Sequence, residues 1–414
     1  MNGLFDQLGA RIDARWFRAH YRERTFADIC ARALAEMAPA RHVNADELLD
    51  WGLGCRRLPR QMDIDANFAE PPLTLFVNDR FHIAAYFWLD GTTCIHEHGF
   101  CGAFQVLEGG SLHTTFDFEP CETVSEHLVL GALTERRVER LRRGDVRAIH
   151  AGAAMIHSLF HLERPSATIV VRTHASADVA AAFRPQYSYS RAGVAWDPWY
   201  DRSDRTRRLQ LLQLTRRTHP QRLPALCERW LGRADTVSAF LGLRRAATLL
   251  SAGDCDELLR KAERTHAVIA PIARKVIDND RREAAIVARR TTVADPRLRF
   301  FLAILLNVRG RAQALRLVRE EFPGRNPVDC VLECVEHLAR LPSPFERGSS
   351  ALGFEADETV LAALRGLLEG RSGQGLVSKV GGSLGRPAKR DERKDIARLC
   401  EGLRRSEMFR FLLA

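Results

Sequence analysis

The spacing of apolar and polar residues divides the chain into three stretches, and the first is predicted to be helical. Phe26, Ile29, Ala33 and Met37 recur at the three-to-four-residue spacing of one helix face. Asn44, followed by an acidic first turn, predicts the start of another helix. We therefore expect an N-terminal helical segment that covers whatever follows it.

Between residues 70 and 175 the apolar residues fall into short runs rich in β-branched and aromatic side chains. Gly, Asp and Pro separate these runs at intervals of about 8–12 residues, which is typical of an antiparallel sandwich or barrel. Residues 176–204 combine turn residues with aromatic side chains that favour burial, so we expect a connector packed on the barrel. The aromatic residues concerned are Tyr187, Tyr189, Trp196, Trp199 and Tyr200.

From Arg205 onward the apolar spacing is helical to the end of the chain. The stretch 371–394 is rich in Gly, Ser and Arg and is expected to be mobile. The sequence thus predicts an α+β multidomain protein. It would comprise a helical segment over 1–69, a barrel with its connector over 70–204, and a basic all-helical domain over 205–414.

Length and composition fit a globular protein of two or three domains, with 414 residues, 46% hydrophobic and 28% charged. No apolar stretch approaches the ~20 residues of a membrane helix, and the N-terminus has no apolar signal core. The ten cysteines are scattered without CxxC pairs, as in reduced cytoplasmic proteins. We therefore expect a cytoplasmic protein without a membrane partner.

The net charge of +10 is unevenly distributed. Residues 1–200 hold 21 Arg or Lys and 25 Asp or Glu, a net of −4, whereas the rest hold 41 and 27, a net of +14. A basic half could bind nucleic acid. Acidic residues are interleaved throughout and no DNA-binding motif is visible, so a solvated face or docking onto the acidic first half is favoured, with a protein partner or a homo-oligomer as further alternatives.

The segment GTTCIHEHG carries the candidate chemistry. On a strand, His96 and His98 point to one face, about 7 Å apart along the chain. Two imidazoles on one face can ligate one metal ion if another strand supplies a third ligand. The later segment offers three candidates for that ligand: His150, His157 and His161.

These residues resemble the cupin superfamily. Its first motif is roughly G-x5-HxH-x3,4-E-x6-G, and this chain has His96, His98 and Gly110 in place, with Gly91 one residue closer to the first histidine than the pattern. The glutamate position falls on Gly102 or Ala103, so the usual carboxylate ligand is absent.

The second cupin motif is matched by Gly144, Gly152 and a displaced His157, with His150 at the proline and His161 at the asparagine position. The resemblance covers residues 71–175. It implies a jelly-roll barrel in which His157 joins His96 and His98 as a metal ligand.

Three histidines without a carboxylate resemble the thiol dioxygenase (cysteine dioxygenase-like) branch. That resemblance implies Fe(II), with Zn, Ni or Mn as other possible metals, and open positions for O₂ and a small anionic or thiol-bearing substrate. Neutral imidazoles suit Fe(II) and leave a dipositive site that favours anions. The family's carboxylate-binding arginine has no counterpart on the strand LTLFVND, and Arg80 and Arg172 are the nearest substitutes.

Further residues are candidates for catalysis. Tyr187 and Tyr189 could donate to a substrate at the barrel mouth, with core packing as the alternative, and His161 is a second histidine near the expected site. An ungapped count puts His174 at the tyrosine position of the family's Ser-His-Tyr relay. We expect Glu97 to point to the opposite face, towards solvent or an arginine.

Other side chains are assigned to the barrel itself. Phe87, Phe100 and Phe104 are candidate walls of the site, and Gln105 is either a packed residue or a fourth ligand. Two further functions compete with the oxygenase. One is a non-catalytic cupin sensor or binding module coupled to the basic helical domain, and the other is a metal-assisted isomerase or hydrolase.

Overall fold

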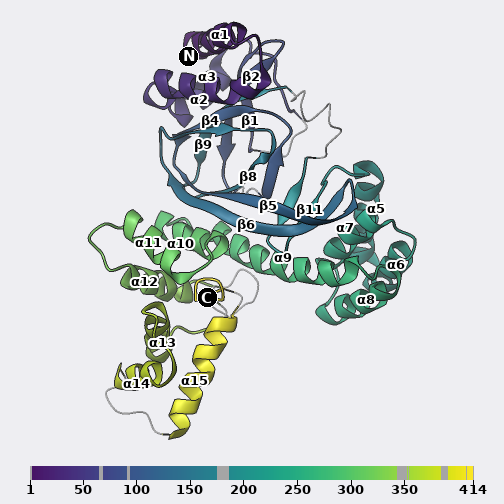
Figure 1. The fold of residues 1–414 in the computed structure, drawn as a ribbon, viewed down its shortest axis with the longest axis vertical. Coiled ribbons are helices and arrows are strands. Elements are labelled where there is room, and N and C mark those ends of the chain that lie inside the picture. Colours follow the sequence, from purple (N-terminus) through teal and green to yellow (C-terminus); the bar gives the residue numbers. More distant parts are fainter. Residues whose placement is uncertain are drawn as a thin grey trace.

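A computed structural model describes residues 2–64, 69–90, 94–174, 186–342, 352, 354–383, 390–406 and 408–413. It confirms the predicted α+β multidomain class: N-terminal helices, a β-barrel and a large helical region follow one another along the chain (Figure 1). Gly91 of the expected motif and residues 176–185 of the expected connector lie outside the described residues.

The N-terminal helices cover the outer face of the barrel (Figure 1). Helix α2 buries Phe26, Ile29 and Ala33. At the start of α3, the Asn44 side chain accepts from the Glu47 amide and the Glu47 carboxylate accepts from the Asn44 amide, both at 2.9 Å. This capping box satisfies two amides that a helix start leaves unpaired. The helices are α1 (Asn2–Arg18), α2 (Phe26–Met37) and α3 (Ala45–Gly54).

Two antiparallel sheets form the barrel. One has the strand order β1-β2-β9-β4-β7, and the other, β10-β11-β6-β5-β8-β3, closes on itself through β10 and β3. This arrangement confirms the antiparallel barrel predicted from the spacing of turns. The strands are β1 (Pro72–Val77), β2 (Phe81–Trp88), β3 (Ile95–His98), β4 (Gly102–Glu108), β5 (Ser111–Ser125), β6 (Leu128–Leu141), β7 (Val146–Ile149), β8 (Gly152–His161), β9 (Ser166–Thr173), β10 (Ser188–Ser190) and β11 (Val194–Trp196).

Alternation along the strands decides which side chains line the barrel. Tyr86, Trp88 and Phe104 belong to one apolar cluster inside it, with Phe100 packed at its edge. Phe87 instead belongs to the cluster shared with the N-terminal helices. The expectation that Phe87 forms a wall of the site is therefore wrong, because its neighbours on β2 take the inward positions.

The aromatic connector contributes strands to the barrel. Strand β10 pairs with β3 and with β11, and β11 pairs with β6. Tyr187, Tyr189 and Trp196 are buried as expected, whereas Trp199 is 53% exposed. Trp199 lies in the turn after β11, where its amide donates to the Asp197 carboxylate at 2.8 Å.

The C-terminal half is helical and packs directly on the barrel (Figure 1). Leu128, Leu130 and Val194 join a core with helices α6–α9, and Leu112 and Phe160 join another with the helices that follow. Part of the segment expected to be mobile forms α14. The helices are α5 (Arg202–Thr218), α6 (Leu223–Leu231), α7 (Thr236–Ala246), α8 (Ala252–Thr265), α9 (Ile269–Thr291), α10 (Pro296–Asn307), α11 (Arg311–Glu321), α12 (Pro327–Arg340), α13 (Glu358–Leu368), α14 (Gly373–Ser383) and α15 (Arg390–Arg405).

Within the described residues, no helix combines the length and the apolar character needed to span a membrane.

Candidate metal centre

Three histidines from two neighbouring strands meet inside the barrel. His96 on β3 lies opposite His157 on β8 in the antiparallel register, so both side chains point to the same face. His98 follows two residues after His96 and shares that face. All three side chains are buried.

The ring nitrogens of this cluster lie at the spacing of a shared ion. One nitrogen from each of His96, His98 and His157 lies within 4.8 Å of the others. The two Nε2 atoms of His98 and His157 are 2.9 Å apart. The cluster is compatible with a divalent metal ion, and among the described residues it contains no carboxylate.

Hydrogen bonds at the back of two rings turn Nε2 towards the cluster. His96 Nδ1 lies 2.8 Å from the Cys94 carbonyl, which can only accept, so Nδ1 carries the hydrogen. His157 Nδ1 lies 3.0 Å from His113 Nε2. In both rings Nε2 is therefore the nitrogen on the side of the cluster.

Burial keeps the three imidazoles neutral. It lowers the pKa of His96, although the Cys94 carbonyl opposes the effect. Burial lowers the pKa of His98 and His157 further, and in each case a neighbouring histidine adds to the shift. A neutral imidazole offers a lone pair to a metal ion without first losing a proton.

The other two candidates for the third ligand lie elsewhere. His150 is exposed. His161 shares the inward face of β8 but lies four residues beyond His157, roughly 13 Å along the strand. Its ring stacks on Trp88 with centroids 4.6 Å apart. The structure thus brings His157 to the His96–His98 pair and leaves His161 outside the cluster.

Tyr187 and Tyr189 lie on the opposite face of β3. Tyr189 pairs with Ile95, and its hydroxyl donates to the Glu97 carboxylate at 2.6 Å. The Tyr187 hydroxyl donates to the Glu126 carbonyl, also at 2.6 Å. Glu97 does point away from the cluster as predicted, and it is buried against these tyrosines, so it does not meet solvent. The structure does not bring the two hydroxyls to the histidines.

His174 belongs to a polar group at the end of β9. Its Nδ1 lies 3.4 Å from His82 Nδ1, and its Nε2 lies 2.7 Å from the Asn78 carbonyl. The Asp63 carboxylate lies 3.7 Å from His82 Nε2 and 3.2 Å from Arg172 Nη1. His174 is therefore connected to Arg172 through other side chains and is not a member of the cluster.

Arg172 is connected to the cluster through Phe100. Its guanidinium lies over the Phe100 ring at 4.0 Å, and that ring packs on His98 with centroids 4.6 Å apart. Arg172 Nη1 donates to the Tyr86 hydroxyl at 3.4 Å. Its Nε is buried and has no hydrogen-bond partner among the described residues. Arg80, the other substitute considered, instead stacks on Tyr21.

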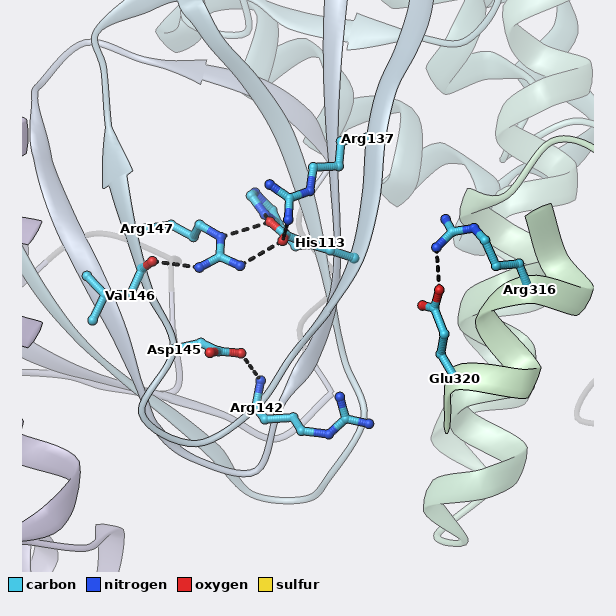
Figure 2. A network of polar contacts seen from close by, with 9 residues as sticks. His113, Arg137, Arg142, Asp145, Val146, Arg147, Arg316 and Glu320 are labelled. Atoms are coloured by element: carbon cyan, nitrogen blue, oxygen red, sulfur yellow. Dashed lines mark hydrogen bonds and ion pairs between the residues drawn. The ribbon is translucent and has the colours of Figure 1, made fainter. Parts of the chain in front are cut away.

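The sequence analysis missed His113, which contacts the cluster from behind. Its Nδ1 lies 3.1 Å from the Glu139 carboxylate, and that carboxylate accepts two hydrogen bonds from Arg147 (Figure 2). A single histidine on a strand carries no signal for this role. Its neighbour His157 becomes adjacent only through the pairing of β5 with β8.

Gln105 is not a ligand of the cluster. Its side-chain oxygen accepts from the Ala40 amide at 3.0 Å, and its nitrogen donates to the Gly144 carbonyl at 3.2 Å. It joins β4 to the N-terminal helices, in keeping with the packing alternative.

Comparison with known protein families finds no matching family, and no curated protein matches the chain. Partial likeness to solved structures exists. A chain from crystal structures of DMSP lyases is 17% identical over 26% of this chain and 48% of its own length, with a TM-score of 0.18. A conserved Klebsiella pneumoniae protein with a double-stranded β-helix domain is 14% identical over 29% of this chain and 93% of its own length, with a TM-score of 0.18.

The capsular polysaccharide assembling protein CapF from Staphylococcus aureus is 13% identical over 34% of this chain and 41% of its own, with a TM-score of 0.16. The matched part thus spans about half of the DMSP lyase chain and less than half of CapF. At these TM-scores the cupin assignment rests on the chain itself. Its closed antiparallel barrel and its three inward histidines fit a cupin.

Proposed function

We propose that the chain is a mononuclear non-haem iron oxygenase of the cupin type, acting on a small anionic or thiol-bearing substrate. The observation that carries the proposal is the buried set of three neutral imidazoles, which has no carboxylate beside it in the part of the chain that the structure describes. His96, His98 and His157 would hold the ion, each through one ring nitrogen. Ferrous iron bound by neutral ligands supplies a dipositive centre that attracts anionic donors and leaves positions for O₂.

The side chains around the cluster support a small anionic substrate. Arg172 lies beside the Phe100–His98 pair and carries a buried Nε that no described residue accepts from. Burial raises the pKa of Tyr86, so its hydroxyl keeps its proton and is a donor at neutral pH. A carboxylate or thiolate near the ion would therefore meet positive charge and a donor on one side.

Apolar side chains inside the barrel would keep water away from the histidine cluster. Tyr86, Trp88, Phe104, Met155 and Leu159 belong to one buried cluster inside it. Such walls exclude water from a reactive centre and strengthen electrostatic contacts there.

The decisive experiment is metal analysis of untagged protein after anaerobic loading with Fe(II). We expect about one iron per chain in the wild type and in His150→Ala, because His150 is exposed. We expect His98→Ala to lose the ion, since the variant removes one of three ligands. Full iron retention by His98→Ala would contradict the assignment of the site.

The metal found also separates the competing functions. Iron with O₂ uptake in the presence of small thiols supports the oxygenase. Zinc, nickel or manganese without O₂ uptake would indicate Lewis-acid chemistry at the same histidines. Absence of any metal after loading would contradict the enzyme and favour a binding module.

A further inference from the structure

We propose that His113 and Glu139 are positioning residues, which fix the tautomer of His157 and aim its Nε2 atom at the cluster. The effect of this arrangement on metal binding rests on the proposed function. The tautomer itself is a property of the chain alone and can be measured without a metal.

The ionised Glu139 carboxylate determines which ring nitrogens of His113 and His157 carry hydrogens. Glu139 Oε1 lies 3.1 Å from His113 Nδ1, and because an ionised carboxylate only accepts, Nδ1 carries the hydrogen. A neutral imidazole has one N–H, so His113 Nε2 is an acceptor. His157 Nδ1, 3.0 Å away, must then donate to it. The only hydrogen of a neutral His157 ring is used there, and its Nε2 lone pair faces His98.

The protonation states that this argument needs are those favoured by the surroundings. The geometry supports a neutral His113, because its ring is buried and the Glu139 charge that it faces is already paired with Arg147 and Arg137. Burial raises the pKa of Glu139, but hydrogen bonds from Arg147 and His113 outweigh it and hold this pKa well below its usual range. The chain of hydrogen bonds therefore ends on the ionised carboxylate of Glu139.

Two arginines hold the Glu139 carboxylate in place, and Figure 2 shows both of them, Arg137 and Arg147, beside His113. Arg147 donates through Nε at 2.8 Å and through Nη2 at 2.7 Å, and its Nη1 donates to the Val146 carbonyl. Arg137 Nη2 lies 2.7 Å from the second carboxylate oxygen. A bidentate pair of this kind fixes orientation as well as charge.

His96 shows the same arrangement with a different acceptor. Its Nδ1 donates to the backbone carbonyl of Cys94, which no substitution can remove. The corresponding acceptor for His157 is a side chain, so it can be changed without touching any of the three inner rings. This difference makes the positioning role testable.

The first test uses Co(II) as a spectroscopic probe, with dissociation constants from chelator competition. We expect His113→Leu and Glu139→Ala to bind Co(II) about 10–100-fold more weakly than the wild type, with a changed d–d spectrum. His113→Gln should restore affinity and spectrum to near wild type, because the amide can accept from His157 and donate to Glu139. A purely structural role would not be rescued in this way.

Glu321→Ala is the matched control. Glu321 also pairs with two arginines, Arg142 at 2.6 Å and Arg140 at 3.6 Å, but it makes no contact with His113. Its Co(II) affinity and spectrum should equal those of the wild type. If Glu321→Ala weakens binding as much as Glu139→Ala, or if His113→Leu binds within twofold of the wild type, the positioning role is overturned.

The second test needs no metal. Long-range ¹H–¹⁵N NMR of histidine-labelled apoprotein should show His157 protonated at Nδ1 and bare at Nε2, and Glu139→Ala should show a tautomer mixture. A wild-type His157 protonated at Nε2 would overturn the proposal, even if Co(II) binds. The predicted tautomer in a wild type that binds no Co(II) would overturn the proposed function and leave the tautomer assignment standing.

Discussion

At the scale of single residues, buried histidines make the stability of this protein sensitive to acid. His161 is fully enclosed between the Trp88 ring and two buried arginines, Arg290 and Arg299. Burial, assisted by these two cations, lowers the pKa of His161 to about 3. In an unfolded chain the same ring titrates near 6.5. Between these two pH values the unfolded state binds the additional proton, so the free energy of unfolding falls as the pH falls.

His161→Phe keeps an aromatic ring beside Trp88 and removes this proton. Between pH 7 and pH 5 the wild type should lose about 2 kcal/mol more of its unfolding free energy than the variant does. Urea unfolding of both proteins at the two pH values measures the difference. The exposed His150→Phe should behave like the wild type, and equal losses in His161→Phe would contradict the buried environment.

Some residues of the candidate site could be predicted from the sequence and others could not. His96 and His98 could be predicted as a pair, because the two-residue period of a strand fixes their common face. Arg172 and His113 could not be assigned to the site, because their positions depend on strand pairings across long stretches of chain. Tyr187 and Tyr189 show the opposite case: their burial was predictable, but the face of β3 on which they lie depends on the register of β10.

At the scale of elements, a few polar side chains join the helical cover to the barrel. Gln105 on β4 satisfies the Ala40 amide and the Gly144 carbonyl, and its nitrogen also lies 3.4 Å from the Leu34 carbonyl. These groups come from both sides of the contact between α2 and the first sheet. A buried glutamine is therefore needed at this position, because an apolar side chain would leave these backbone groups without hydrogen bonds.

Gln105→Leu should destabilise the protein by about 2 kcal/mol, because it leaves buried backbone groups without partners. Chemical denaturation monitored by circular dichroism measures this loss. Gln210→Leu, on the exposed face of α5, should stay within about 0.5 kcal/mol of the wild type. A Gln105→Leu protein as stable as Gln210→Leu would show that water replaces the lost contacts.

Element boundaries followed well from periodicity where the pattern was long. The helix around Phe26, Ile29, Ala33 and Met37 was predicted in place. Strands β10 and β11 were not, since three residues each are too short to show an alternation. The segment over 373–383 was expected to be mobile because of its glycines, yet Leu376 and Val380 are buried in the C-terminal core and α14 forms around them.

At the scale of the whole molecule, barrel and helices share their cores. Leu128, Leu130 and Trp196 from strands lie in one cluster with helices α6–α9. Leu112 and Phe160, from the same sheet, lie in another with the later helices. The predicted domain boundary near residue 204 therefore separates strands and helices that share two apolar cores.

We expect barrel and helices to unfold together in one transition. Tryptophan fluorescence, which reports tertiary structure, and far-ultraviolet circular dichroism should give coincident denaturation curves. Neither the barrel nor the helical part can keep its core without the other. A chain ending at residue 204 should aggregate, as it would expose these leucines and aromatic residues. Two separated transitions, or a stable truncated chain, would instead show that the predicted domains are independent.

The closed sheet also sets an order of events during synthesis. His98 leaves the ribosome well before its neighbours: β8 ends at His161, and β10, which closes the ring beside β3, ends at Ser190, about 90 residues after His98. At about 5–20 residues per second, that interval is roughly 5–18 s. During it, the first two histidines of the cluster are exposed to whatever metal the surroundings offer. The three histidines are therefore brought together only after β8 has been made and has paired with β3.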